Sequence, residues 1–291
     1  MLPAWQGIAL AGAAQGRGPS LRLLALFGAG AALMRAAGCA YNDIVDRDLD
    51  ARVTRTAGRP IASGQITERG AWAFLVACAL ASLTILLSLN LLSFYLGVAS
   101  LGLVAAYPFM KRITWWPQAW LGLTFNWGAL MGFAAALGGP SSGLLLRVLV
   151  SGGALSGRVD AVVSPLPWPP ILLYAAGAAW TLGYDTLYAL QDIEDDALAG
   201  VRSSALRLGP AAPRAVTGFY AASLALALAS GWLAGLGPLF TVGAMLFGVQ
   251  LAWQARRVRL GDPVLALTLF KSNTPAGAIL FVAICAGAWR L

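Results

Sequence analysis

The sequence predicts an all-α membrane protein, a polytopic bundle of about nine transmembrane helices. Of its 291 residues, 59% are hydrophobic and only 11% are charged. The mean hydropathy of +0.73 is far above that of a soluble globular domain. Apolar runs of roughly 17 to 25 residues recur along the chain, long enough to cross a bilayer as helices and without strand-like alternation. We therefore expect one integral-membrane domain that covers residues 1–291.

The apolar runs locate the individual helices. The first run is short, because only about a dozen apolar residues precede Gln15 and Arg17, and we expect an incomplete first membrane helix there. The expected spans are residues 3–14, 21–41, 70–89, 91–109, 115–137, 170–190, 213–234, 236–255 and 273–290. Residues 140–170 are rich in proline and carry no motif, so we expect an extracytoplasmic loop.

Composition excludes several kinds of chemistry. The chain has no histidine, and Cys39, Cys78 and Cys285 stand singly within apolar runs, which argues against zinc sites, Ser-His catalysis and a disulfide framework. The net charge of +8 comes from short basic groups between apolar runs, so we expect a lipid bilayer and no nucleic acid as partner. Most Lys and Arg lie in the loops after the second, fourth, sixth and eighth spans, which the positive-inside rule assigns to the cytoplasm.

A first acidic cluster follows the second span. Asn42, Asp43, Asp46 and Asp50 stand at i, i+1, i+4 and i+8. On a helix Asn42, Asp46 and Asp50 fall within about 80° of one another, with Asp43 beside them and Arg35 two turns earlier on the same stripe. One wall of this helix therefore carries four oxygen-bearing side chains and a cation.

A second acidic cluster follows the sixth span. Asp185, Asp192 and Asp196 stand at i, i+7 and i+11, which brings them within about 40° on a helix, and Tyr188 lies at the margin of this stripe. Carboxylates gathered in this way repel unless a cation neutralises them, and an all-oxygen set without His or Cys favours Mg²⁺. Mg²⁺ also prefers phosphate oxygens among its ligands, which predicts a diphosphate between the two walls.

Two other uses of these acids remain open from the residues alone. They can be solvated caps at helix ends, paired with nearby arginines, although acids near a membrane interior are usually functional. They can also serve proton or cation transport, although a transporter is expected to hold its carboxylates near the midplane on broken helices. Their position at the ends of the spans favours the metal site.

The acidic segments resemble those of a known family. NDIVDRDLD, which begins at Asn42, is similar to the N-D-x-x-D-x-x-x-D motif of the UbiA superfamily of membrane prenyltransferases. DIEDD, which begins at Asp192, is similar to the D-x-x-x-D motif of the same superfamily. The segments RAAGCAYNDIVDRDLDARVTRTAGRPIASGQIT and GYDTLYALQDIEDDALAGVRSSALRLG resemble the 4-hydroxybenzoate polyprenyltransferase branch in particular.

The resemblance implies a role for each matching residue. The Mg²⁺ ligands would be Asp43, Asp46, Asp50, Asp192 and Asp196. Asn42, Tyr107 and Tyr188 would bind substrate, and Lys111, in a Y-x-x-x-K motif with Tyr107, would reach the diphosphate. Without the family, Tyr107 reads equally as an interfacial aromatic and Lys111 as a positive-inside charge.

Two further residues are catalytic candidates with alternatives left open. Asp185 would orient the phenol or accept a proton, or it is another metal ligand. Arg35 matches a family arginine near the substrates, and from its chemistry it is either a counter-ion for Asp46 or an anchor for a carboxylate of the acceptor.

The implied activity is transfer of a polyprenyl group from a polyprenyl diphosphate to the ring of 4-hydroxybenzoate, a step of ubiquinone biosynthesis, by Mg²⁺-assisted ionisation and electrophilic aromatic substitution. Another UbiA-type transfer, to haem, chlorophyllide, a naphthoate or a glycerophosphate, is the alternative within the family, and an ion-coupled transporter is the alternative outside it. Because no transit segment is visible, we expect a multi-pass protein of a bacterial inner membrane with the active site facing the cytoplasm.

Overall fold

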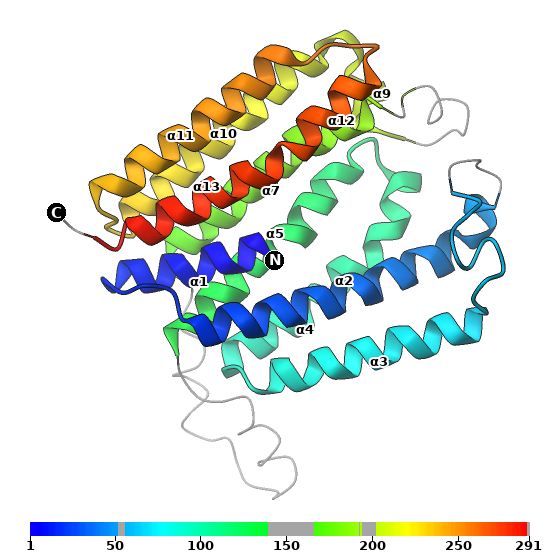
Figure 1. The fold of residues 1–291 in the computed structure, drawn as a ribbon, viewed down its shortest axis with the longest axis horizontal. Helices are drawn as coiled ribbons and strands as arrows, with labels where there is room; N and C mark the ends of the chain where they lie inside the picture. The colour runs from blue at the N-terminus through cyan, green and yellow to red at the C-terminus, as the bar shows by residue number, and fades with distance from the viewer. Residues whose placement is uncertain (52–55, 139–165, 192, 194–201, 290–291) are drawn as a thin grey trace, which may run out of the picture.

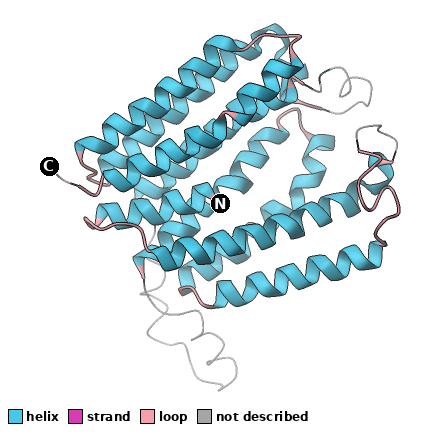
Figure 2. Cartoon of the chain, in the orientation of Figure 1, coloured by secondary structure: helices cyan, strands magenta, loops and turns pink. Residues whose placement is uncertain are grey.

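The computed structural model consists of helices joined by turns and loops, with no strand in the part of the chain that it describes (Figure 2). It describes all residues except 52–55, 139–165, 192, 194–201 and 290–291. The side chains of Leu49, Lys111 and Arg112 are also outside the description. The expected loop at residues 140–170 therefore falls almost wholly outside the described residues.

The helices follow one another with short connections. In chain order they are α1 (Leu2–Ala14), α2 (Leu21–Asp50), α3 (Glu68–Leu87), α4 (Leu91–Ile113), α5 (Pro117–Leu137), α7 (Trp168–Ala189), α9 (Ser204–Leu208), the 3₁₀ turn η1 (Gly209–Ala211), α10 (Ala212–Leu233), α11 (Pro238–Arg257), α12 (Pro263–Lys271) and α13 (Asn273–Ala286). Among the described residues, seven candidate spans are long and apolar enough to cross a membrane. With α1 and α7 they make up the nine helices of the expected bundle, and the predicted fold class is confirmed.

The bundle has two groups of helices with α1 and α5 between them (Figure 1). One group contains α2, α3 and α4, and the other contains α7, α10, α11 and the α12–α13 pair. Helix α5 packs on both α4 and α7, and α1 packs on α5 and α13. The C-terminal ends of α2 and α7 lie at the same edge of the bundle, on the right of Figure 1. The helix that carries the first acidic segment and the helix that precedes the second therefore end on one side of the molecule.

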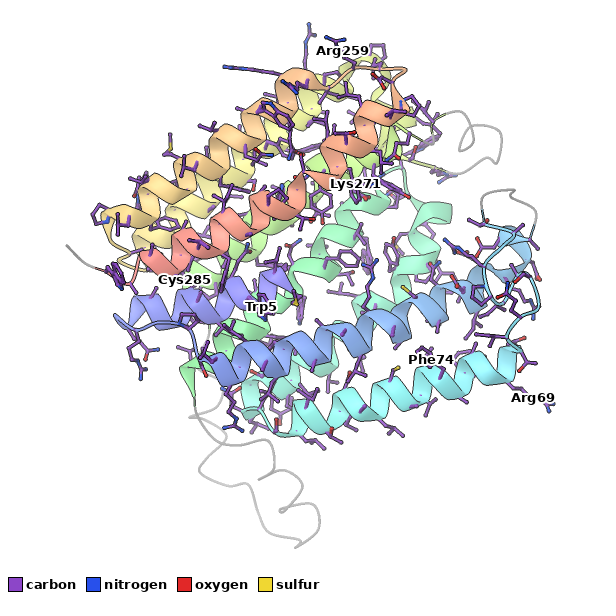
Figure 3. All side chains as sticks on the ribbon, in the orientation of Figure 1. Trp5, Arg69, Phe74, Arg259, Lys271 and Cys285 are labelled. Carbon is purple, nitrogen blue, oxygen red and sulfur yellow. The ribbon has the colours of Figure 1, made fainter. Side chains whose placement is uncertain are left out.

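Helix α3 has an exposed apolar surface, which indicates that lipid surrounds the bundle. Large apolar side chains of this helix are between 40% and 57% exposed, and they are Trp72, Phe74, Val76, Leu80 and Leu83. Figure 3 labels Phe74 on the outer face of the bundle. An apolar patch of this extent is unfavourable in water and is covered by lipid when the helix crosses a bilayer. Arg69, in the first turn of the same helix, lies at the edge where α2 ends.

Helix α1 is central although it has only thirteen residues. The Gln6 side chain is buried and donates through Nε2 to the main-chain carbonyl of Gly277 on α13, at 3.1 Å. Trp5, labelled in Figure 3, donates through Nε1 to the carbonyl of Leu24 on α2 at 2.9 Å and packs on Phe281 of α13. The short first helix thus joins the beginning of the chain to its last helix.

Local sequence explains where the helices begin. Thr67 and Asn90 are N-caps whose side chains accept hydrogen bonds from the main-chain N–H groups of Gly70 and Ser93. Proline occupies the first position of α5, α11 and α12, where its missing N–H has no intrahelical partner to lose. The capping side chains and the prolines thus determine the residue at which these helices begin.

Two expected spans need correction. The expected span 21–41 stops too early, because α2 continues to Asp50 and the first acidic motif is its last two turns. The expected span 273–290 begins too late, because the apolar segment starts at Pro263 and is interrupted at Ser272, between α12 and α13. Pro275 lies in the first turn of α13 and has no N–H to continue the ladder, which is the physical reason for a break here. Lys271, assigned above to a loop, is in fact the last residue of α12 (Figure 3).

Candidate active site

The first acidic motif is the C-terminal end of α2, as the helical spacing predicts. Asp46 and Asp50 are one turn apart and almost completely buried, at 1% and 6% exposure. Asn42 and Asp43, one turn earlier, are half-buried. Carboxylates are rarely buried so deeply without charge compensation. The burial of Asp46 and Asp50 therefore requires nearby cations or hydrogen-bond donors.

A loop after α2 supplies one such cation. Arg59 donates from Nη1 to Asp43 Oδ1 at 3.0 Å and to Asp50 Oδ2 at 2.8 Å. These acids are seven residues apart on α2, so their carboxylates converge on a single nitrogen. Arg59 was not among the predicted site residues, because it is one of the basic residues after the second span that determine membrane topology. Arg59 stands before Pro60, in a short polar loop directly after the acidic helix. This position is the feature of the sequence that could have indicated Arg59 as a partner of the acids.

The loop that carries Arg59 is tied down by local contacts. The Thr56 hydroxyl donates to the main-chain carbonyl of Asp50 at 3.0 Å, and the Ser63 hydroxyl donates to the carbonyl of Arg59 at 2.8 Å. Ile61 is buried beneath the loop. Gly64 has φ +76, a left-handed conformation that glycine adopts without strain. These contacts direct Arg59 back toward α2.

The donor chemistry of this cluster fits Mg²⁺. Two carboxylates already converge on one positive charge, and all side-chain donors in the motif are oxygens, which hard cations prefer. No group of three or more His, Cys, Asp and Glu side chains in the described part of the chain is placed to hold a metal by itself. Mg²⁺ is usually held by one or two carboxylates and completes its shell with water and phosphate oxygens. A site completed by a diphosphate is consistent with both observations.

Charged and polar residues of both acidic helices lie near the Tyr107 phenol. Tyr107 of α4 lies within electrostatic range of Asp46 and Arg35 on α2 and of Asp185 and Tyr188 on α7. Arg35, Asp46, Tyr107, Asp185 and Tyr188 were all predicted as site residues, from three separate segments of sequence. The structure gathers these five residues around one phenol.

Helix α4 lacks one main-chain N–H donor beside this phenol. Pro108 lies inside the helix directly after Tyr107, and its ring cannot complete the hydrogen-bond ladder. Two carbonyls just before it accept side-chain hydrogen bonds, that of Leu103 from Trp120 Nε1 at 2.8 Å and that of Ala105 from the Tyr41 hydroxyl at 3.3 Å. Side chains of α5 and α2 thus bind the backbone of α4 immediately before Tyr107.

A buried polar chain supports α7 beside Asp185. Asn126 of α5 donates through Nδ2 to the Thr181 hydroxyl at 2.8 Å, and Thr181 is also hydrogen-bonded to the Tyr184 hydroxyl at 3.1 Å. A side chain at position 177 would overlap Asn126, so glycine at this position lets the two helices approach. The chain of hydrogen bonds fixes the rotation of α7 and with it the direction of Asp185.

An aromatic row lies along the same helix. Trp180, Tyr184 and Tyr188 stand one turn apart, and the rings of Tyr184 and Tyr188 pack on Phe270 of α12 with centroid distances of 5.9 and 4.9 Å. Trp180 also packs on Phe247 of α11 at 5.3 Å. Tyr188 was predicted as a site residue but Phe270 was not, because nothing in the local sequence of α12 distinguishes Phe270 from the other apolar residues.

Three predicted residues cannot be placed. Asp192 and Asp196 lie outside the described residues, and the side chain of Lys111 is not described, although α4 continues to Ile113. Arg202, the first described residue after Asp196 in the sequence, contacts the end of α4 and the residues that follow it. Its Nη1 donates to the carbonyl of Ile113 at 2.7 Å, and its guanidinium lies 5.7 Å from the ring centroid of Trp115. Arg202, the residue at which the described chain resumes, is therefore fastened to the end of α4.

Comparison with known proteins identifies the family. A family model described as the UbiA prenyltransferase family matches residues 1–288. This chain belongs to the UbiA prenyltransferase family. Two UbiA-type relatives share 42% identity with it. The match to the mitochondrial 4-hydroxybenzoate polyprenyltransferase of Aedes aegypti extends over 270 residues, 92% of this chain and 55% of that protein. The match to the protein of the same name from Arabidopsis thaliana extends over 285 residues, 98% of this chain and 64% of that protein. The chain thus spans less than two thirds of the length of these relatives.

Solved UbiA structures share the fold. The structure of a UbiA homolog from Aeropyrum pernix K1 matches with a TM-score of 0.74 and 28% identity, and the match covers 97% of this chain and 96% of that one. A UbiA homolog from Archaeoglobus fulgidus, bound to GPP and Mg²⁺, matches with a TM-score of 0.60 and 20% identity over the same shares of the two chains. The helical bundle is therefore that of the UbiA family.

The relatives correct the expected location. We expected a bacterial inner membrane with the site facing the cytoplasm, because no transit segment is visible in the sequence. The two similar enzymes are mitochondrial proteins of an insect and a plant. A multi-pass membrane protein is supported, and the bacterial inner membrane is not. The physical reason for the error is that hydropathy and the distribution of Lys and Arg describe insertion into a bilayer and do not identify which membrane it is.

Proposed function

We propose that this UbiA-family chain transfers a polyprenyl group from a polyprenyl diphosphate to the aromatic ring of 4-hydroxybenzoate. The observation that carries the proposal is the cluster around Tyr107, where Asp46 from the first motif and Asp185 from the helix before the second motif approach one phenol inside an otherwise apolar bundle. The names of the two similar relatives support the choice of donor and acceptor.

Mg²⁺ is the proposed cofactor. Asp43, Asp46 and Asp50 on α2, with Asp192 and Asp196 after α7, are the proposed ligands. The all-oxygen donor set and the convergence of Asp43 and Asp50 on one cation support this assignment, as does the Mg²⁺ bound with GPP in the Archaeoglobus homolog. A bound Mg²⁺ supplies charge neutralisation for the departing diphosphate.

The protein residues contribute binding and orientation. Lys111 and Asn42 bind the diphosphate, and Arg35 holds the carboxylate of the acceptor by a charge-assisted contact. The C–O bond between the allylic carbon and the diphosphate breaks, and the electron pair stays with the diphosphate. A new C–C bond then forms at the ring carbon next to the phenol-bearing carbon, which is electron-rich. Transfer of the proton from that carbon to a base, for which the Asp185 carboxylate is the candidate, restores the aromatic ring.

Asp185 and the tyrosines complete this chemistry. The Asp185 carboxylate orients the phenol of the acceptor by accepting its hydrogen bond, which increases electron density in the ring. Tyr107 and Tyr188 line the space between the acids of α2 and α7, and Phe270 supports Tyr188 from α12. An apolar, water-poor surrounding protects an allylic cation from capture by water.

A direct assay tests the proposal. The purified protein in detergent micelles is incubated with geranyl diphosphate, Mg²⁺ and ring-labelled 4-hydroxybenzoate, and products are separated by chromatography. We expect a geranylated aromatic acid that still carries the ring label, and no product after treatment with EDTA until Mg²⁺ is restored. An active preparation that prenylates a naphthoate but never 4-hydroxybenzoate would refute the assignment of the acceptor.

A further inference from the structure

Arg59 is placed where a divalent cation would be expected to bind. Its Nη1 lies 3.0 Å from Asp43 Oδ1 and 2.8 Å from Asp50 Oδ2, so one nitrogen bridges two carboxylates. The Asp50 side chain is 8% exposed and that of Asp43 is 23% exposed, whereas Arg59 itself is 36% exposed. The acids are thus held inside the site, and the cation that compensates them reaches in from its edge.

The Arg59 side chain is well suited to move away from the two carboxylates and to return to them. The loop from Thr56 to Ile66 is fixed by its own hydrogen bonds, including those of Ser63 and of the Ile66 N–H to the Pro60 carbonyl at 3.0 Å. A fixed loop with a long, partly exposed side chain lets the guanidinium swing while its Cα stays in place. The planar fork of arginine also binds a phosphate through two hydrogen bonds.

We infer that Arg59 is an internal counter-ion that holds Asp43 and Asp50 together before the metal binds, and that it transfers to the diphosphate when the metal takes its place. This inference rests on the proposed function. Two carboxylates that converge from positions two turns apart on one helix repel, and a cation between them keeps them converged. A divalent ion that binds both acids removes the attraction that holds Arg59. The freed guanidinium then faces the negative charge of the diphosphate.

Competition between Arg59 and the metal has a consequence that a purely structural role of Arg59 would not have. Because Arg59 and the metal compete for the same carboxylates, removal of the guanidinium strengthens binding of the metal alone. Because Arg59 also binds the diphosphate, the same change weakens binding of the prenyl diphosphate. A residue that only stabilised the loop would weaken both. Opposite changes in the two affinities are therefore the signature of Arg59 as a positioning residue.

The test uses Mn²⁺ as a spectroscopic substitute for Mg²⁺. Free Mn²⁺ is titrated by electron paramagnetic resonance against the wild type, Arg59→Gln and Arg47→Gln in detergent micelles, without and with geranyl diphosphate. Arg47 is the matched control, because it is a nearby arginine on α2 that pairs instead with Asp48 and Glu68. Without diphosphate, we expect Arg59→Gln to bind Mn²⁺ about tenfold more tightly than the wild type, and Arg47→Gln to match the wild type.

The second half of the test uses the diphosphate. With Mn²⁺ present, we expect geranyl diphosphate to bind Arg59→Gln about tenfold more weakly than the wild type. Arg59→Lys guards against misfolding, since it keeps the charge and should retain wild-type Mn²⁺ affinity while losing part of the diphosphate affinity. Unchanged or weaker Mn²⁺ binding by Arg59→Gln would overturn the inference and leave the proposed function standing. A wild type that binds no Mn²⁺ even with geranyl diphosphate would overturn both.

Discussion

Trp180 of α7 donates a hydrogen bond through Nε1 to Asn273 Oδ1 at 2.8 Å, at the point where the last membrane segment breaks into α12 and α13. Asn273 Nδ2 donates to the carbonyls of Leu269 and Phe270, both at 3.1 Å. A helix interrupted within an apolar bundle leaves main-chain groups without partners, and each unsatisfied group is costly there. The Asn273 amide satisfies two of these groups and connects them to α7.

This arrangement predicts the effect of removing either partner. Asn273→Ala should destabilise the protein by about 1–3 kcal/mol, because buried carbonyls and the indole N–H lose their partners. Trp180→Phe removes only the indole donor and should cost less. Thermal unfolding of both variants and of the double variant in one detergent gives the coupling between the two positions. A double variant as unstable as the sum of the two singles would show that the hydrogen bond contributes nothing.

The close packing of α1 on α5 makes a prediction about glycine. A Cβ atom at Gly132 would overlap the main-chain carbonyl oxygen of Ala4, so Gly132→Ala must push the two helices apart. We expect a loss of about 1–3 kcal/mol of stability from this overpacking. Gly102→Ala is the control, because nothing lies within 4 Å of a Cβ there. Thermal midpoints should fall for Gly132→Ala only, and equal midpoints for the two variants would contradict the packing.

Substitution of two aspartates of the first motif should affect the rate of prenyl transfer very differently. Asp46 is 1% exposed and faces the cluster around Tyr107, whereas the side chain of Asp48 is 80% exposed and pairs with Arg47. Asp46→Asn should reduce the rate of prenyl transfer at least about a hundredfold, since it removes a proposed metal ligand at nearly constant volume. Asp48→Asn should stay within about twofold, since exposed ion pairs contribute little. Initial rates of prenyl transfer to the labelled acceptor compare the two variants. Near-normal turnover of Asp46→Asn would show that Asp46 is not a metal ligand.

Arg202 gives a prediction about the edge of the site. Arg202 follows the second motif in the sequence and binds Ile113 and Trp115 at the end of α4, so Arg202→Ala should lower kcat/KM for the prenyl diphosphate about tenfold. Arg202→Lys should recover only part of the loss, since lysine lacks the planar fork. The control is Arg214→Ala, which removes an exposed arginine of α10. A fall in kcat/KM of the same size in this control would show that general surface charge, and not the fastening, is responsible.

The sequence predicts the helices and the first acidic stripe well because both depend on local periodicity. Apolar runs define the spans, and residues four apart on one helix face the same way, so Asn42, Asp46 and Asp50 could be placed together without a structure. Their partner Arg59 could not, because a contact from a loop depends on how that loop folds back. Phe270 was missed for a similar reason, since its contact with Tyr188 arises from helix packing.

The break at Ser272 could have been found and was not. Pro275 is visible in the sequence and is a known reason for a helix to stop. Lys271 lies between the eighth and ninth expected spans and was therefore counted with the basic residues of a loop. The structure places it at the end of a short helix instead, where the chain turns before continuing as α13.

The hydrogen bond from Gln6 to Gly277 sets a constraint on how the protein is made. The two residues are 271 positions apart in the chain, so the ribosome needs roughly 15 to 55 seconds to deliver the second after the first at about 5–20 residues per second. During that interval the amide of Gln6 has no carbonyl of α13 to bind, although leaving it unpaired in lipid is unfavourable. Closure of the bundle is therefore a late event of biosynthesis, and interruption of translation before α13 would leave α1 without its final partner.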